Sequence, residues 1–138
     1  LETVSGESFT SIFDKIIYGK EDFRIFLDDA LKVFGWKFSV IKSENISWQL
    51  GLKTYFKNGH LKVLNVLEGS AAYNSLVVKE DEILAVNNFR IDNNLDHWLN
   101  YFENDQIIMK VSRNGKILDI NINNSNDNQY FKYKFSEE

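Results

Sequence analysis

Three groups of residues in this sequence could do chemistry: two histidines, a run of carboxylates and a loop centred on a glycine. His60 and His97 lie far apart, and neither begins a His-Glu-x-x-His helix, which would place two zinc ligands and a general base on one face. The chain has no cysteine, so it has no thiolate nucleophile and no sulfur zinc site. We therefore predict no catalytic centre and no cofactor within these residues.

The carboxylates of Glu80, Asp81 and Glu82 are consecutive. Three neighbouring side chains cannot all face one metal ion without an unusual loop. Asp81 is better interpreted as an acceptor for main-chain N–H groups of its own turn. His60 stands next to a tight turn and is predicted to be exposed.

The stretch Leu50-Gly51-Leu52 offers main-chain groups instead of side chains. N–H groups around a glycine can converge on an anion, and a glycine lets the main chain approach a ligand closely. If a strand begins at Leu52, the N–H groups of these three residues can bind a peptide carboxylate. A plainer interpretation, an ordinary glycine in a bulge, stays open.

Hydrophobic periodicity predicts the elements that would hold this loop. Residues 8–19 and 23–34 each carry one apolar stripe at helical spacing. From Trp36 the period falls to two, which predicts strands over 36–40 and 46–52. Neither helix is long enough to be stable alone, so both stripes must pack on something.

Further along, two Asn-Gly pairs at 58–59 and 114–115 each predict a two-residue hairpin turn between strands. A short helix is predicted between Asn93 and Glu103. The stretch "YFKYKF" at 130–135 alternates like a final strand, with inward positions predicted for Phe131, Tyr133 and Phe135.

Composition limits the class of partner. The 138 residues are 43% hydrophobic, which is enough to bury a core, and the length favours one domain with an attachment. The net charge of -4 argues against a nucleic-acid partner. No apolar run is long enough to span a bilayer, and no signal segment opens the chain.

The order of elements resembles the PDZ domain family in its bacterial arrangement, over residues 47–123. "QLGL" at 49–52 matches the carboxylate-binding loop, "GSAAY" at 69–73 the small helix, and "DEILAVNN" at 81–88 the strand that follows. The resemblance implies an α+β fold: a PDZ-like partly open β-barrel with a short groove helix, here preceded by two amphipathic helices.

The same resemblance implies a peptide groove between strand 52–56 and helix 95–102. A peptide or protein C-terminus would add a strand to the open edge. The residues expected to line this groove are Lys53, Thr54, Leu95, Trp98 and Phe102, with the carboxylate at Leu50, Gly51 and Leu52. Trp98 could instead pack into the core. His97 could select hydroxyl side chains of the ligand, or it could simply face solvent.

Three positions depart from the PDZ pattern: Ala71 replaces a proline, and Leu76 and Glu80 replace glycines. A residue other than glycine at positive φ costs about 1 to 2 kcal/mol. We therefore predict that the turn geometry at Leu76 and Glu80 has changed.

The flanking sequence resembles the glycyl aminopeptidase family of metallopeptidases. "FDKIIYGKED" at 13–22 is similar to the end of the catalytic body in that family. The implied organisation is a helical tail of a missing peptidase domain at 1–35, a connecting strand at 36–46, the PDZ-like domain at 47–123, and a loop and strand at 124–138. Zinc and the catalytic residues would belong to the missing domain, which would be a second partner. The family is bacterial, and the compartment, cytoplasmic or periplasmic, stays open.

The sequence thus favours a non-catalytic peptide-binding module from the C-terminal region of a bacterial zinc metallopeptidase. One alternative is a structural brace whose groove is occupied by the chain's own "YFKYKF" segment, along the edge of strand 52–56. Another is a PDZ scaffold or secretion adaptor without a peptidase.

Overall fold

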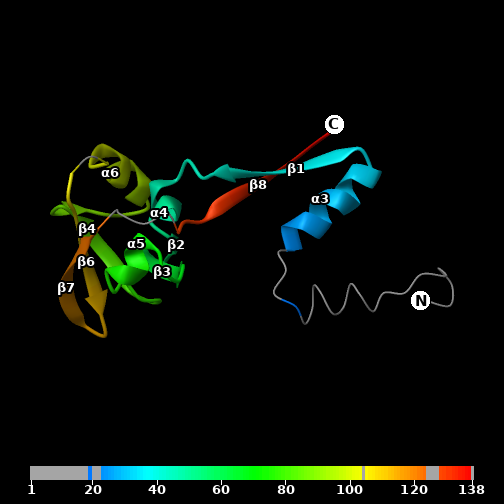
Figure 1. Cartoon of the computed structure of the whole chain (residues 1–138). Helices are drawn as coiled ribbons and strands as arrows, with labels where there is room; N and C mark the ends of the chain where they lie inside the picture. Colours follow the sequence, from blue (N-terminus) through cyan, green and yellow to red (C-terminus); the bar gives the residue numbers. More distant parts are fainter. Residues whose placement is uncertain (1–18, 20–22, 104, 124–127, 138) are drawn as a thin grey trace. The chain divides into compact units, whose positions relative to one another are not determined.

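The computed structural model describes residues 19, 23–103, 105–123 and 128–137 (Figure 1). They form two compact units: one takes the described residues up to Val40 and those from Tyr133 on, and the other runs from Ile41 to Lys132. The helix predicted for 8–19 lies outside the described residues except for Gly19. Among the helices in these ranges, none is long and apolar enough to cross a membrane.

The first unit contains helix α3 (Phe23–Val33), which ends before Gly35 at a φ of 71°. Strands β1 (Trp36–Lys42) and β8 (Phe131–Glu137) pair with each other in a two-stranded sheet. The Phe38 ring stacks on Tyr133, with 5.4 Å between the ring centres.

The inward orientation predicted for the aromatic residues of β8 is wrong. Phe131, Tyr133 and Phe135 are 38%, 58% and 49% exposed, although β8 is indeed a strand. A two-stranded sheet has little of its own to bury a side chain against. Alternation therefore identified the strand but not a buried face.

The second unit is built on an antiparallel sheet in the order β2-β3-β4-β6-β7, with β5 paired to β4. Its strands are β2 (Leu52–Lys57), β3 (His60–Val66), β4 (Glu82–Val86), β5 (Phe89–Arg90), β6 (Ile107–Arg113) and β7 (Lys116–Ile122). The α+β character is as predicted. The described strands form open sheets, with β2 and β7 at the edges of the larger one, and no closed barrel is seen among them.

Both predicted hairpin turns are present. Asn58 and Gly59 have φ values of 52° and 82°, and Asn114 and Gly115 have 51° and 78°, as a type I′ turn requires. Asn87 and Asn88 use the same device between β4 and β5, with φ values of 47° and 67°. This third turn was not predicted, because an Asn-Asn pair is a weaker hairpin signal than Asn-Gly.

The strand predicted to begin at Ile46 is instead a short helix, α4 (Ile46–Gln49). The Leu50 N–H donates to the Ile46 carbonyl oxygen at 2.9 Å, and both side chains are buried. Residues four apart share a helix face. Apolar residues at 46, 48 and 50 therefore fit one helical turn as well as they fit a strand.

The core lies between the sheet and three short helices: α4, α5 (Ala71–Asn74) and α6 (Leu95–Tyr101). Ser70 caps α5 by accepting a hydrogen bond from the Tyr73 N–H at 3.2 Å. The small side chains of Ala71 and Ala72 are buried. Leu50, Leu52, Leu95 and Leu99 are core residues as well.

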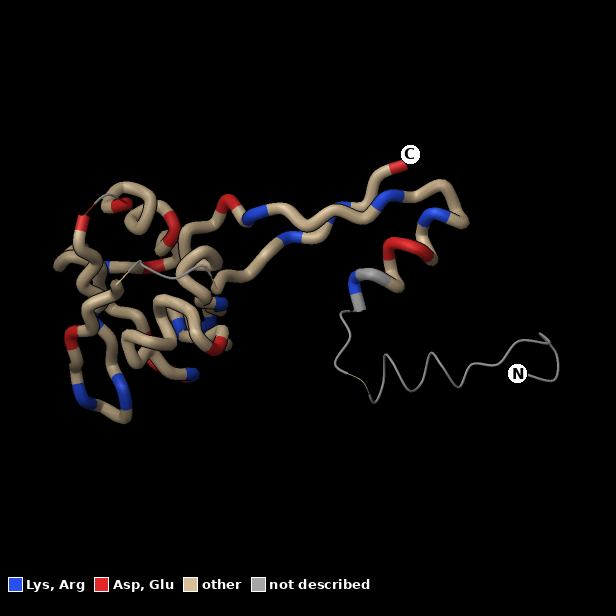
Figure 2. Tube along the Cα trace, in the orientation of Figure 1, with Lys and Arg blue, Asp and Glu red and all other residues tan. Residues whose placement is uncertain are grey.

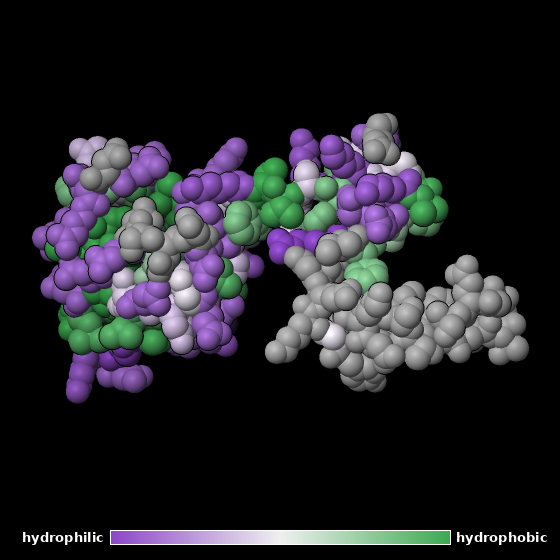
Figure 3. All heavy atoms as spheres, viewed as in Figure 1, coloured by the Kyte–Doolittle hydropathy of each residue, from purple (hydrophilic) through white to green (hydrophobic). Residues whose placement is uncertain are grey.

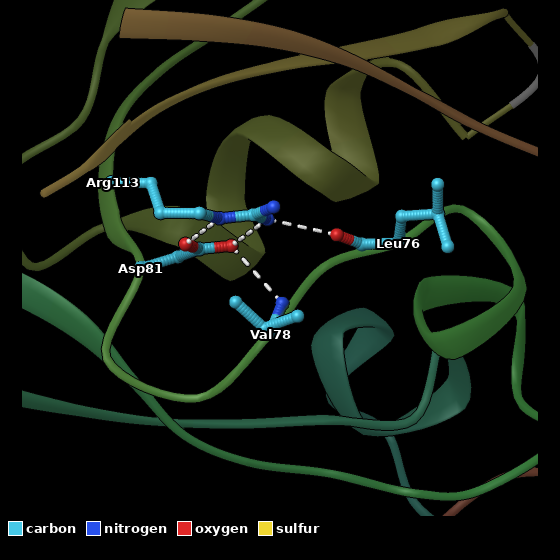
Figure 4. A network of polar contacts seen from close by, with 4 residues as sticks. All are labelled: Leu76, Val78, Asp81 and Arg113. Carbon is cyan, nitrogen blue, oxygen red and sulfur yellow. Dashed lines mark hydrogen bonds and ion pairs between the residues drawn. The ribbon is translucent and has the colours of Figure 1, made fainter. Parts of the chain in front are cut away.

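Leu76 and Glu80 have positive φ values of 65° and 70°, so the predicted change of turn geometry is wrong. A polar network around the buried Asp81 holds this turn (Figure 4). Asp81 accepts from the Val78 N–H at 3.0 Å, which confirms its predicted role, and from both Nε and Nη2 of Arg113 at 2.7 Å.

Arg113 also ties the strained turn to β6. Its Nη2 donates to the Leu76 carbonyl oxygen at 2.8 Å, and the hydrogen bond with Asp81 raises the pKa of the guanidinium. A strained backbone conformation persists where several surrounding contacts hold it in place. The network thus retains left-handed positions that glycine would adopt more easily.

Candidate functional site

The predicted carboxylate loop is held mainly by its own chain. The Leu50 N–H donates to Ile46 and the Gly51 N–H donates to Trp48, at 2.9 and 3.0 Å. Their carbonyl oxygens accept from Ala72 and Leu67, at 3.0 and 2.9 Å. Two of the three N–H groups expected to hold a carboxylate are thus engaged within the loop, and the carboxylate role of Leu50, Gly51 and Leu52 stays a prediction.

Gly51 is required by packing. Its φ is 80°, and a Cβ added there would lie 2.2 Å from the Ser70 Cβ and 2.3 Å from its Oγ. The close approach that this glycine permits is therefore to the N-cap of α5, and Gly51 lies in the turn after α4 and not in a bulge.

The edge of β2 is the second part of the candidate site. Thr54 pairs with Val63 of β3, but Val63 donates its N–H to Asp81 and accepts from the Glu80 N–H, both at 2.9 Å. In an antiparallel ladder, residues in such a pair direct their main-chain groups away from each other. The N–H and C=O of Thr54 therefore face the open edge of the sheet.

Lys53 precedes this position and forms a cation–π contact with two rings. Its Nζ lies 4.8 Å from the ring centre of Trp48 and 4.5 Å from that of Tyr130. The Tyr130 hydroxyl accepts from Asn65 Nδ2 at 3.0 Å, and burial raises the pKa of the phenol. Side chains from three separate parts of the chain thus contact one another around Lys53.

The segment that carries Tyr130 lies against the loop. The Tyr130 N–H donates to the Trp48 carbonyl oxygen at 2.9 Å. A Cβ at Gly69 would lie 2.6 Å from Nδ2 of Asn128. Residues 128–130 therefore pack beside the predicted carboxylate loop. Strand β8 pairs with β1 and not with β2, so the alternative in which residues 130–135 occupy the edge of strand 52–56 is wrong.

Helix α6, the other element of the predicted groove, has two distinct flanks. Leu95 and Leu99 enter the core. On one flank Asp96 Oδ1 accepts from the Ser47 N–H of α4 at 2.7 Å. On the opposite flank Trp98 and Phe102 contact Phe89, with ring centres 4.5 and 5.6 Å away. At 100° per residue this division follows from the helix itself.

The predicted groove residues are therefore spread over several environments. Lys53 and Thr54 are half-buried on β2, Leu95 is buried, and Trp98 and Phe102 are half-buried beside Phe89. For Trp98 this agrees with the packing alternative. Asp96 on the α4 flank was not anticipated, although the core spacing of Leu95 and Leu99 already places it on the other side from Trp98.

The histidines lie on different elements. His97 is exposed, and its ring lies edge-on to Trp98 with 5.4 Å between centres. His60 is exposed as predicted, and its Nδ1 lies 2.6 Å from Glu82 Oε1. Within the part of the chain that the structure describes, no three His, Asp or Glu side chains gather to hold a metal ion.

Comparison with known structures finds proteins of similar fold. A solved aminopeptidase N family protein from Idiomarina loihiensis matches 96% of this chain with a TM-score of 0.72 at 18% identity. This chain spans 24% of that protein's length, and a likeness at this identity shows a shared fold. A solved PDZ domain of HtrA3, bound to a phage-derived ligand, matches 73% of this chain and 92% of its own length, with a TM-score of 0.46 at 13% identity. No family model and no curated protein matches the sequence.

Proposed function

We propose that this chain is a non-catalytic, PDZ-like peptide-binding module from the C-terminal region of a zinc metallopeptidase similar to the glycyl aminopeptidases. Its role is to hold an extended peptide or a protein C-terminus near the active site of a catalytic domain outside this chain. The fold shared with part of an aminopeptidase N family protein supports this setting. The carrying observation is the open edge of β2, where Thr54 presents main-chain groups away from β3.

Strand addition along β2 explains how such a ligand binds. The ligand strand would pair with the outward N–H and C=O of Thr54, and alternate side chains would contact α4 and the α6 flank that carries Asp96. Zinc would be held by the catalytic domain, so the chain alone should not hydrolyse glycyl or other aminoacyl substrates. Metal-dependent turnover that is lost on changing His60 or His97 would contradict this.

The edge is tested by removing its donor. Thr54→Pro deletes the outward N–H while leaving the ladder to β3 intact, which an edge strand tolerates. Peptides with a free C-terminus and an apolar last residue should bind the parent chain at about micromolar affinity, or about -8 kcal/mol. Tryptophan fluorescence, to which Trp48 beside the loop contributes, reports the binding. We expect at least a tenfold loss in Thr54→Pro.

Ile117→Pro is the matched control, because β7 is the other edge of the sheet and Ile117 is its second residue. It pairs with Ser112 next to the closing pair of the Asn114-Gly115 turn, so its N–H faces outward in the same way. Binding should be unchanged in this variant. Equal losses in both variants, or none in either, would reject strand addition at β2.

The carboxylate loop needs a separate comparison. Amidating the peptide removes its charge, and a charge-assisted hydrogen bond is worth about 1.5 to 3 kcal/mol. Weaker binding of the amidated peptide would support the role of Leu50, Gly51 and Leu52. Equal affinity would reject that role and leave the β2 edge as the binding site.

A structural brace is the second candidate, and one observation favours it: the Tyr130 N–H already donates to Trp48 beside the loop. Tyr130→Pro removes this donor. If the segment is a brace, this variant should lose stability and still bind no peptide. If the segment competes with a ligand, the same variant should bind peptides more tightly than the parent chain does.

A further inference from the structure

A connected group of aromatic side chains covers the flank of α6 that faces β5. We call it the aromatic surface: Phe89, His97, Trp98, Tyr101 and Phe102. Phe89 stacks on Trp98 with 4.5 Å between ring centres, and the Tyr101 ring meets Phe102 edge-on at 4.9 Å. Every member contacts at least one other.

Much of this surface faces solvent. Phe89 is 45% exposed and Tyr101 is 69% exposed, while Trp98 and Phe102 are half-buried beneath them and pack against the core. Figure 3 shows that hydrophilic residues cover much of this unit, with apolar ones between them. Tyr, Trp and Phe are enriched at the centres of protein interfaces, where rigid rings give large contacts at little entropic cost.

The charge around the aromatic surface has one dominant sign. Residues 89–105 include four carboxylates but a single basic residue, Arg90; Asp96 lies on the opposite flank of α6, which leaves Asp92, Glu103 and Asp105 for this surface. Figure 2 shows acidic positions at α6 and no basic position along that helix. Arg90 lies 3.7 Å from Asp92, and Asp96 is bound to Ser47. Glu103 and Asp105 are both exposed at the end of α6, where the Asp105 N–H donates to Phe102.

We propose that the aromatic surface is a docking site for a partner protein segment that carries an arginine next to an apolar residue. A guanidinium stacks on aromatic faces and pairs with carboxylates through a planar fork, so exposed rings beside Glu103 and Asp105 match both of its preferences. An acidic rim repels nucleic acid and anionic lipid. Lys53 already lies between two rings of this unit, which is the same kind of cation–aromatic contact made within the chain.

This site is separate from the proposed peptide edge. Trp98 and Phe102 lie on the flank of α6 opposite Asp96, which faces α4. A ligand on the aromatic surface therefore needs neither the Thr54 main chain nor a free C-terminus, and the two proposals can fail independently.

The probe is a pool of nine-residue peptides that carry fluorescein on the N-terminal amine and an amide at the C-terminus, so that neither terminus of the peptide is charged. Arginine is fixed at position five and leucine at position six, with small neutral residues elsewhere. Matched pools carry citrulline or glutamate in place of arginine. We expect the arginine pool to bind with at least tenfold higher affinity than either matched pool, and to weaken as salt rises.

Two variants test the location. Tyr101→Ala removes an exposed ring, and the double variant Glu103→Lys with Asp105→Lys reverses the rim charge; both leave the core residues in place. Each should weaken the arginine pool at least tenfold. The controls, Tyr73→Ala and Glu68→Lys, change an exposed ring and an exposed carboxylate elsewhere in the same unit and should stay within twofold.

Several results would overturn the proposal. These are no binding by the arginine pool, equal binding of the citrulline pool, or equal losses in the variants and their controls. Binding abolished by Thr54→Pro but unaffected by Tyr101→Ala would assign the peptide to the β2 edge instead. Binding of neutral oligosaccharides that persists in the charge-reversed variant would assign the rings to a different class of ligand.

Discussion

Replacing Arg113 by alanine tests whether a buried ion pair holds the strained turn before β4. Asp81 has a side chain that is 0% exposed, and two of its three hydrogen bonds come from Arg113. Arg113→Ala leaves this carboxylate buried with the Val78 N–H as its partner in the network. The Leu76 carbonyl oxygen loses its contact with Arg113 at the same time.

The loss of stability in Arg113→Ala follows from the charge that is left unpaired. Removing one partner of a buried pair costs about 3 to 5 kcal/mol, because the remaining charge has lost water and gained nothing. Asp81→Ala should cost less, because the Arg113 side chain is 30% exposed and water can solvate part of the guanidinium. The alanine double variant should show a coupling energy of about 2 kcal/mol or more.

Urea unfolding measures these energies in a Trp36→Phe background, where the remaining Trp48 and Trp98 both report on the unit from Ile41 to Lys132. The control is Asp119→Asn, which removes the more exposed hydrogen-bonded pair between Lys110 and Asp119 and should cost less than about 1 kcal/mol. A loss for Arg113→Ala as small as that of the control would refute the argument that burial makes this pair essential.

Three further outcomes follow from the backbone and from one phenol. In urea unfolding, Gly51→Ala should destabilise the protein by at least about 2 kcal/mol, because the new Cβ would overlap Ser70. Gly59→Ala should cost only about 1 to 2 kcal/mol, because Gly59 also has a positive φ but no atom lies within 4 Å of the new Cβ. Leu76→Gly should stabilise the folded protein by less than about 1 kcal/mol, because the relief of backbone strain at a φ of 65° exceeds the added entropy of the unfolded chain. A loss of stability in this variant would show that Leu76 is not strained. Burial raises the Tyr130 pKa above 10.0, so its contribution to stability is complete below that pH and is lost as pH rises through the raised pKa. Tyr130→Phe should therefore flatten the fall of the urea midpoint as pH rises above 10.0, and an unchanged slope would contradict this.

The features predicted correctly are those that few residues determine locally. Asn-Gly pairs specify type I′ turns because both positions need positive φ, so the hairpins at 58–59 and 114–115 follow from two residues each. Asp81 as a turn acceptor is equally local. Helix α6 is also readable, because Leu95 and Leu99 give it a core-facing spacing.

The features predicted wrongly depend on contacts between distant residues. Ile46 and Leu50 fit a strand and a helical turn equally well, and the burial of both side chains in a core that also contains Ala72 goes with the helix. Leu76 keeps its left-handed conformation where Arg113 binds it from 37 residues away. Neither of these long-range contacts is visible in a local sequence pattern, so local propensity alone predicted the wrong conformation at both places.

The difference between local patterns and long-range contacts also affects how this chain would recognise a peptide. A glycine-centred loop indicates an anion nest when only its sequence is considered, but Leu50 and Gly51 donate to α4 carbonyls, and Gly51 is required by its contact with Ser70. A nest that must break its own hydrogen bonds to accept a carboxylate gains little from doing so, because each lost bond cancels much of the new one. The outward groups of Thr54 carry no such cost among the interactions that the structure describes. In the peptide binding that we propose, affinity should therefore depend more on the β2 edge than on the loop, so the Thr54→Pro variant should lose more binding than amidation of the ligand does.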